Sequence, residues 1–195
     1  GKGELATIAE GCRVAQEFVQ YATELQRERI PIEDLWVATK CGESDTTSGI
    51  ASCPAVGNLI DKLDARGITS CFGETTEITG GGKPLAPRAA NPGAAAGIMK
   101  GLPAHRFKVD DLSDSQPSKG NKAGGLSTIE EKAFGNLQKI GEKAMYIDVL
   151  APAQAPTRGP GLYFMDTSSA AAECLPLQAA AGFVLPLVFP WIGPS

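Results

Sequence analysis

The sequence predicts an α/β fold with an open, mostly parallel sheet and helices on both faces. Short apolar runs of strand length alternate with stretches of helical periodicity, which is typical of parallel βαβ units. With 195 residues, 43% of them hydrophobic, the chain can bury one sizeable core. Small polar clusters follow several of the strand-like runs. We therefore predict a single α/β domain over residues 1–195.

The first third of the chain is expected to form two helix–strand pairs. Apolar residues recur every three or four positions over 5–25, which predicts an amphipathic helix. LWVAT (35–39) is typical of a short buried strand. The stretch 54–67 predicts a second helix, because its proline suits the first turn and its glycine a left-handed stop. ITSCF (68–72) predicts the second strand.

Residues 79–124 are rich in Gly, Pro and Ala and predict a long irregular loop region. We expect one helix within it, roughly over 88–100. A loop of this length in a compact domain is usually functional or mobile.

The last third of the chain again alternates helices and strands. Ser127 and Glu130 stand three residues apart, the spacing of a capping box, at the start of a helical stretch. Four further elements are expected: strands at 145–151 and 162–166, a helix at 167–182 and a final strand at 183–189.

Composition excludes several classes of protein. The net charge is −4, without basic runs, so we expect no nucleic-acid partner. The five cysteines form no CxxC pair, which excludes a zinc finger and favours reduced thiols. The start of the sequence has no secretory signal, and the apolar C-terminal run is interrupted by prolines, which makes it a poor membrane span. We expect a cytoplasmic protein without a membrane partner.

Polar clusters follow three of the predicted strands, namely CGESD (41–45), GETTE (73–77) and MDTSS (165–169). Open parallel sheets bind ligands beyond the carboxyl ends of their strands, so we expect the three loops to share one crevice. The converging side chains are Cys41, Glu43, Ser44, Asp45, Thr46, Thr47, Ser48, Glu74, Thr75, Thr76, Glu77, Asp166 and Thr167.

Clustered acids favour a bound cation or a raised pKa. Cys41, Asp45, Glu74 and Glu77 are the candidate ligands, and thiolate with carboxylate suits Fe²⁺, Mn²⁺ or Zn²⁺. Such a metal could hold a polyhydroxy acid, acidify its α-carbon proton and stabilise the enolate. The alternative is structural: Asp45 caps a turn, Ser48 bonds its own backbone, and Cys41 is a buried thiol.

The stretch GNKAGGLSTIEEK (120–132) is a second candidate site. Its glycines lead into a helix whose first N–H groups could hold a carboxylate. Lys132 with Glu131 is a candidate proton shuttle or carboxylate contact, and a solvated charge pair is the alternative. His105 is the only histidine, so every Ser–His–Asp or Cys–His scheme would have to run through it.

Four segments together resemble the altronate/galactarate dehydratase family, in order and in spacing, over nearly the whole chain. They are LWVATKCGESDTTSGIASCPAVG, GETTE, GNKAGGLSTIEEKAFG and GLYFMDTSS. The resemblance implies a metal-dependent hydro-lyase, commonly with Fe²⁺ and with Mn²⁺ left open. Its substrate would be a sugar acid such as galactarate or altronate, and its product a 2-keto-3-deoxy acid.

The same resemblance leaves two alternatives open. The family includes the large subunit of sulfolactate sulfo-lyase, which expels sulfite from 3-sulfolactate. A non-catalytic assembly domain is the other alternative, motivated by departures from the family pattern: Glu43 in place of a glycine, Cys53 before Pro54, GGGKPLAPR in place of a Glu-His pair, and the divergent tail.

By position, the resemblance implies a set of site residues, although it does not say which one is the base. Catalytic candidates are Cys41, Asp45, Glu131 and Lys132; substrate-binding candidates are Ser44, Ser48, Gly49, Asn121, Gly124, Gly125, Thr128, Asp166 and Thr167.

The resemblance also implies a partner. The family usually carries a small, β-rich N-terminal domain that is not found in this sequence. We therefore expect the chain to be the C-terminal part of a larger dehydratase, or to work with a separate small subunit. Whether it forms a homo-oligomer is left open.

Overall fold

A computed structural model describes residues 3–42, 44–109 and 117–189, with no side-chain description for 101–109. Its five strands form one sheet in the order β3-β4-β2-β1-β5, and every neighbouring pair is parallel. The strands are β1 (Val37–Cys41), β2 (Ser70–Phe72), β3 (Tyr146–Leu150), β4 (Leu162–Met165) and β5 (Leu185–Phe189). The predicted parallel α/β fold is confirmed.

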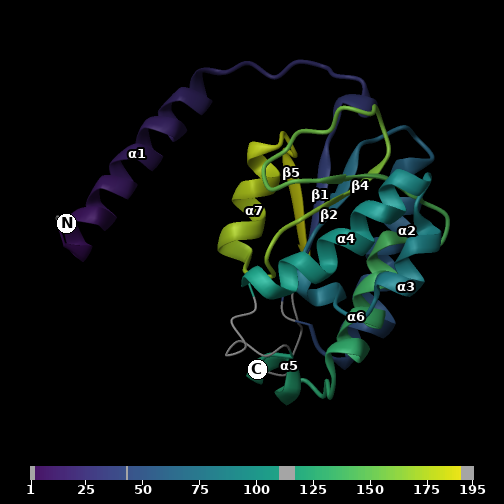
Figure 1. Ribbon diagram of the computed structural model, residues 1–195. Coiled ribbons are helices and arrows are strands. Elements are labelled where there is room, and N and C mark those ends of the chain that lie inside the picture. The colour runs from purple at the N-terminus through teal and green to yellow at the C-terminus, as the bar shows by residue number, and fades with distance from the viewer. Residues whose placement is uncertain (1–2, 43, 110–116, 190–195) are drawn as a thin grey trace. The chain divides into compact units, whose positions relative to one another are not determined.

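Helices cover both faces of this sheet (Figure 1). In Figure 1, α7 lies on one side of the strands, and α2 and α4 lie on the other. The helices of this part of the chain are α2 (Cys53–Asp64), α3 (Gly82–Leu85), α4 (Pro92–Val109), α5 (Lys119–Ala123), α6 (Ile129–Leu137) and α7 (Ala171–Ala180).

The core has two layers, one on each face of the sheet, because successive strand residues point to opposite faces. On the α7 side, Cys71 and Tyr163 pack with Phe183. On the other side, Phe72 and Phe164 pack against each other, with ring centroids 5.1 Å apart. The short central strands are therefore buried on both faces, as their apolar sequences predict.

Helix α1 (Glu4–Glu24) belongs to a separate compact unit, Gly1–Ile30, whereas Pro31–Ser195 forms the second unit. The predicted helix is present. None of its residues is buried, and Phe18 is 69% exposed. None of the described helices is long and apolar enough to cross a membrane.

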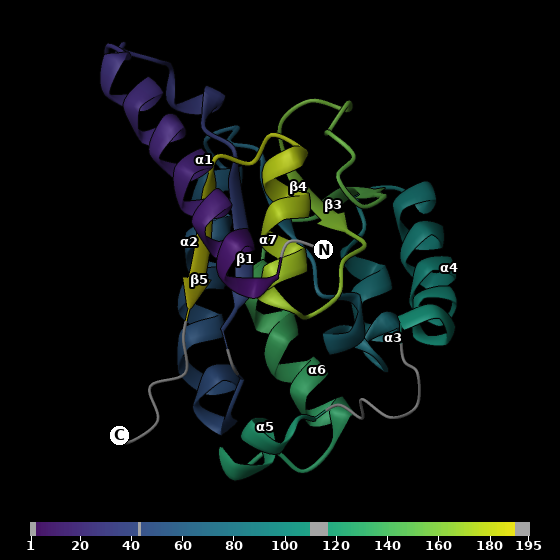
Figure 2. The ribbon, with the colours of Figure 1, turned by 90° about the vertical axis from the view of Figure 1, so that its left-hand side faces the viewer.

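The interval 79–124 differs from the expected long loop in its described part. It contains α3, a 3₁₀ turn (Ala86–Arg88), α4 and α5, and α4 lies beside β3 (Figure 2). Pro92 occupies the first helical position of α4, where proline is tolerated, and the alanines that follow favour a helix. The prediction gave too much weight to the glycines and prolines.

The predicted cap of the helix after Gly125 is shifted by one residue. Thr128, not Ser127, is the N-cap of α6, and its side chain accepts a hydrogen bond from the Glu131 backbone N–H. The Glu131 carboxylate accepts hydrogen bonds from the N–H and O–H of Ser127. Glu131 therefore fixes the start of α6.

Candidate functional site

The loops that follow β1, β2 and β4 meet at one edge of the sheet, as predicted. The backbone N–H of Cys41 donates to Glu74 Oε2 at 3.0 Å, and the N–H of Glu74 donates to Thr167 Oγ1 at 2.9 Å. The Thr75 hydroxyl donates to Asp166 Oδ1 at 2.6 Å. Three separate strand ends are thus linked through the loop of Glu74.

Glu74 is the centre of a buried ionic cluster. Its Oε1 accepts from Lys40 Nζ at 2.6 Å and its Oε2 from Lys139 Nζ, and both lysine side chains are buried. Burial alone would raise the pKa of Glu74, but the charges of Lys139 and Lys40 lower it to about 2. Glu74 also has a φ of +69°, a strained backbone conformation of the kind that often marks functional sites.

A second buried carboxylate, that of Glu77, belongs to the same cluster. Its Oε1 lies 3.0 Å from Lys132 Nζ, and its Oε2 accepts from Asn136 Nδ2 at 2.9 Å. Lys132 Nζ also donates to Asn121 Oδ1 at 2.9 Å. Burial and the charge of Glu74 raise the pKa of Glu77. The pKa of Glu74 is therefore lowered and that of Glu77 is raised, a divergence found in many acid–base sites.

Cys41 completes the cluster. Its thiol donates to Asn136 Oδ1 at 2.9 Å, and Lys139 Nζ lies 3.5 Å from its Sγ. A hydrogen bond with Cys53, followed by burial, raises the pKa of Cys41 well above its usual value.

One potential metal ligand atom from each of Cys41, Glu74 and Glu77 lies within 4.8 Å of the others. One thiol and two carboxylates suit a divalent metal in donor type and spacing. Both carboxylates, however, already bind lysine ammonium groups. Asp45 lies outside this group of three.

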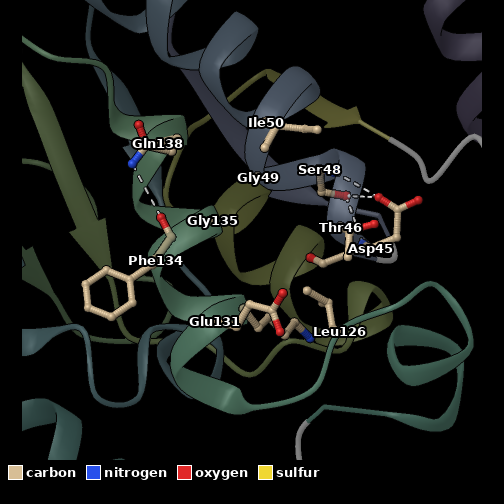
Figure 3. A pocket seen from close by; sticks show the side chains of 12 residues that line it. Asp45, Thr46, Ser48, Gly49, Ile50, Leu126, Glu131, Phe134, Gly135 and Gln138 are labelled. Carbon is tan, nitrogen blue, oxygen red and sulfur yellow. Dashed lines mark hydrogen bonds between the residues drawn. The ribbon is translucent and has the colours of Figure 1, made fainter.

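A cavity of about 290 Å³ adjoins the cluster, between residues 44–50, which lead into α2, and α6. Figure 3 shows Asp45 and Ser48 on the loop side, with Phe134 and Gln138 on the side of α6 and the turn that follows it. The lining residues are Ser44, Asp45, Thr46, Ser48, Gly49, Ile50, Leu126, Glu131, Lys132, Phe134, Gly135 and Gln138. The cavity thus combines apolar side chains with the hydroxyl groups of Ser44 and Ser48 and with three charged residues, Asp45, Glu131 and Lys132.

Comparison with known proteins places this site in a family. Residues 32–190 match the family described as D-galactarate/altronate dehydratase, C-terminal. The chain belongs to this family. The resemblance to the altronate/galactarate dehydratase family is therefore confirmed.

Three relatives of this chain carry the names of different lyases. It is 54% identical over 187 residues to the (2R)-sulfolactate sulfo-lyase subunit beta of Chromohalobacter salexigens, covering 93% of this chain and 48% of the relative. It is 34% identical over 178 residues to the galactarate dehydratase (L-threo-forming) of Escherichia coli, covering 89% and 33%. It is 36% identical over 134 residues to an altronate dehydratase of Bacillus subtilis, covering 67% and 27%. The chain thus spans half or less of these relatives.

The first family segment forms one wall of the cavity. Ser44, Asp45, Ser48 and Gly49 line it. Asp45 Oδ1 accepts from the backbone N–H of Ser48 at 2.8 Å and from the Thr47 hydroxyl at 2.7 Å. Burial would raise the pKa of Asp45, but these hydrogen bonds lower it. Asp45 therefore holds its own turn and is one of the residues that line the cavity.

The glycines of the third family segment allow that segment to approach the loop of Asp45. A Cβ added at Gly124 would lie 2.6 Å from Asp45 Cβ. Gly125 has a φ of +94°, and a Cβ there would lie 3.0 Å from Thr46. Asn121 Nδ2 donates to the carbonyl of Ser44 at 2.7 Å. These residues position the cavity wall rather than line it.

The remaining expected site residues fall into two groups. Glu131 and Lys132 line the cavity, and Lys132 Nζ lies 3.0 Å from a carboxylate oxygen of Glu77. Thr128, Asp166 and Thr167 do not line it; Thr128 caps α6, and the other two bond the loop of Glu74.

Sequence reasoning missed Lys40, Lys139, Asn136 and the position of Cys53 beside Cys41. Lysine is almost never fully buried unless it is paired. A lysine inside the apolar run LWVATKC was therefore a usable signal for Lys40. His105 and Glu43 lie outside the residues whose side chains are described.

Proposed function

We propose that this chain is the core of a lyase that eliminates a β-leaving group from a 2-hydroxy acid, with 3-sulfolactate as substrate. The observation that carries the choice of substrate is the 54% identity, over 93% of the chain, to a protein named as a sulfolactate sulfo-lyase subunit. Identity to the galactarate dehydratase is 34%.

The proposed reaction removes the C2 proton of sulfolactate and breaks its C3–S bond. The C–H electrons form the C2–C3 double bond, and the C–S electrons leave with sulfite. The enol that remains takes up a proton at C3 and becomes pyruvate. The protein must therefore bind an anion, accept a proton and stabilise negative charge beside the carboxylate.

Lys132 is the residue we assign to substrate binding. Lys132 is one of the residues that line the cavity, and its ammonium group lies 3.0 Å from Glu77 Oε1 and 2.9 Å from Asn121 Oδ1. A fixed ammonium group can bind a carboxylate or a sulfonate without reorganising during the reaction. Ser44 and Ser48 supply hydroxyl groups on the facing wall.

A divalent metal, Fe²⁺ first and Mn²⁺ second, would supply Lewis-acid stabilisation of the enolate when bound. Cys41, Glu74 and Glu77 are the residues that would hold it. We place Asp45 in the wall of the cavity instead, because it is not a member of that group.

A hydro-lyase acting on galactarate or altronate is the second candidate. It is favoured by the family match and by relatives named galactarate and altronate dehydratases. The chemistry differs mainly in the leaving group, which is water instead of sulfite, so the same cavity residues would serve.

We also propose that the active protein includes a second part, either a small domain or a small subunit. The relative with 54% identity is named subunit beta, and this chain spans 48% of its length.

The test is a product assay with the full-length protein, its candidate small subunit and Fe²⁺ under anaerobic conditions. We expect sulfite from 3-sulfolactate and no 2-keto-3-deoxy acid from galactarate or altronate. The opposite pattern would establish the dehydratase. Failure with all three substrates, in a folded and metal-loaded preparation, would leave only the non-catalytic alternative.

A further inference from the structure

The ammonium group of Lys139 lies among the donor atoms of the candidate metal triad. Its Nζ donates to Glu74 Oε2 and lies 3.5 Å from Cys41 Sγ. The side chain is 0% exposed. Cys41 and Glu74 are two of the three residues whose ligand atoms fall within 4.8 Å of one another.

We propose that Lys139 occupies, with its ammonium group, the place that a divalent cation would take between Cys41 and Glu74. The cluster is then closed to metal as long as Lys139 stays in it. Lys139 thereby controls metal occupancy. This inference rests on the triad named for the proposed function, but it does not depend on which acid is the substrate.

The backbone that carries Lys139 is packed closely against α2. Lys139 lies in the 3₁₀ turn Gln138–Ile140, which packs tightly against α2. A Cβ at Gly57 of α2 would lie 2.1 Å from the Gln138 carbonyl oxygen and 2.8 Å from the Gly141 nitrogen. The turn has no room to retreat toward α2, so only the side chain itself can move away.

Electrostatic repulsion prevents the Lys139 ammonium group and a divalent cation from occupying the site at the same time. An ammonium group and a divalent cation that share the same carboxylate oxygen would lie within a few ångströms of each other in a buried site. Like charges at that separation repel strongly where water does not screen them. Glu74 Oε1 is paired in addition with Lys40 at 2.6 Å, which strengthens the exclusion.

Cobalt provides a readout that does not depend on activity, because Co²⁺ bound to a thiolate gives a near-ultraviolet charge-transfer band. The full-length protein would be titrated with Co²⁺ as wild type and as Lys139→Met, Lys139→Gln and Lys139→Arg. Lys143→Met is the matched control, because Lys143 is exposed. Cys41→Ser in each background identifies the thiolate responsible for the band.

We expect a Cys41-dependent band in Lys139→Met and Lys139→Gln, with Co²⁺ bound at least about tenfold more tightly than in wild type. Wild type, Lys139→Arg and Lys143→Met should develop the band only at correspondingly higher Co²⁺ concentrations, because in each of them the metal has to displace the cation at position 139. If the neutral variants are destabilised, Co²⁺ should raise their Tm selectively, since a ligand stabilises the state that binds it.

Two results would overturn the proposal. One is a Cys41-dependent band that develops in wild type at the same Co²⁺ concentrations as in Lys139→Met. The other is neither a band nor a Co²⁺-dependent rise in Tm in both neutral variants. If the wild-type protein releases no sulfite from 3-sulfolactate while the cobalt results are as expected, the proposed function is wrong but the role of Lys139 stands.

Discussion

The carboxylate of Glu74 is shared by two buried ammonium groups, those of Lys40 and Lys139. Removing one member of such a cluster leaves an uncompensated buried charge, which typically costs about 3–5 kcal/mol. We expect Glu74→Gln to lower the free energy of unfolding by about that amount in urea titrations at pH 7. Glu142→Gln, at an exposed position, is the control and should be nearly neutral. Equal stability of the two variants would show that the cluster is not stabilising.

The same residue predicts a pH dependence. The pKa of Glu74 in the folded protein is about 2, below its ordinary value of 4.5. The unfolded chain therefore binds this proton first as the pH falls, so the contribution of Glu74 is complete above pH 4.5 and is lost toward pH 2. The stability difference between wild type and Glu74→Gln should shrink over that window. A constant difference down to the lowest measurable pH would contradict the assignment.

Part of the cluster could be predicted from the sequence and part could not. Cys41, Glu74 and Glu77 were expected together because their loops follow neighbouring strands. Lys139 and Asn136 reach Cys41 across 98 and 95 positions of the chain. They come from the end of α6 and the turn after it, not from a strand end. The sequence pattern of a helix does not predict how that helix packs against the sheet.

At the scale of elements, the contact between α2 and the turn Gln138–Ile140 depends on Gly57. A Cβ at this position would lie 2.1 Å from a backbone oxygen, and backbone cannot move aside as a side chain can. We expect Gly57→Ala to cost about 1–3 kcal/mol or more, measured by urea unfolding. Gly11→Ala in α1 is the matched control, because nothing lies within 4 Å of its added Cβ. That change should be neutral or stabilise the helix slightly.

Helices and strands could be predicted from the sequence where the hydrophobic periodicity was clear and where proline or glycine marked the ends of an element. The strands β1 and β4 and the helix α2 appear within a few residues of the predicted bounds. The helix expected roughly over 88–100 is present as α4, but it continues to Val109, where the glycine and proline of KGLP had suggested a loop. Its buried contacts, through Ala94 and Ile98, override that local preference.

At the scale of the whole chain, the α/β unit from Pro31 onward is expected to fold without α1. Helix α1 belongs to the other compact unit, Gly1–Ile30. Deleting residues 1–30 should therefore leave the Tm of the α/β unit within about 2 °C of its value in the longer chain, measured by circular dichroism. A fall of more than about 5 °C would show that α1 stabilises the sheet, since such a shift corresponds to roughly 1–2 kcal/mol in a unit of this size.

We propose that the strand-end loops and α6 together form one anion-binding lyase site, with Lys132 at its cavity. The most direct test is kcat/KM for sulfite release from 3-sulfolactate by Lys132→Met, beside wild type and the exposed-site control Lys122→Met. We predict a loss of at least about tenfold in Lys132→Met alone, because a charge-assisted hydrogen bond contributes roughly 1.5–3 kcal/mol. Wild-type kcat/KM in a folded Lys132→Met protein would contradict the account.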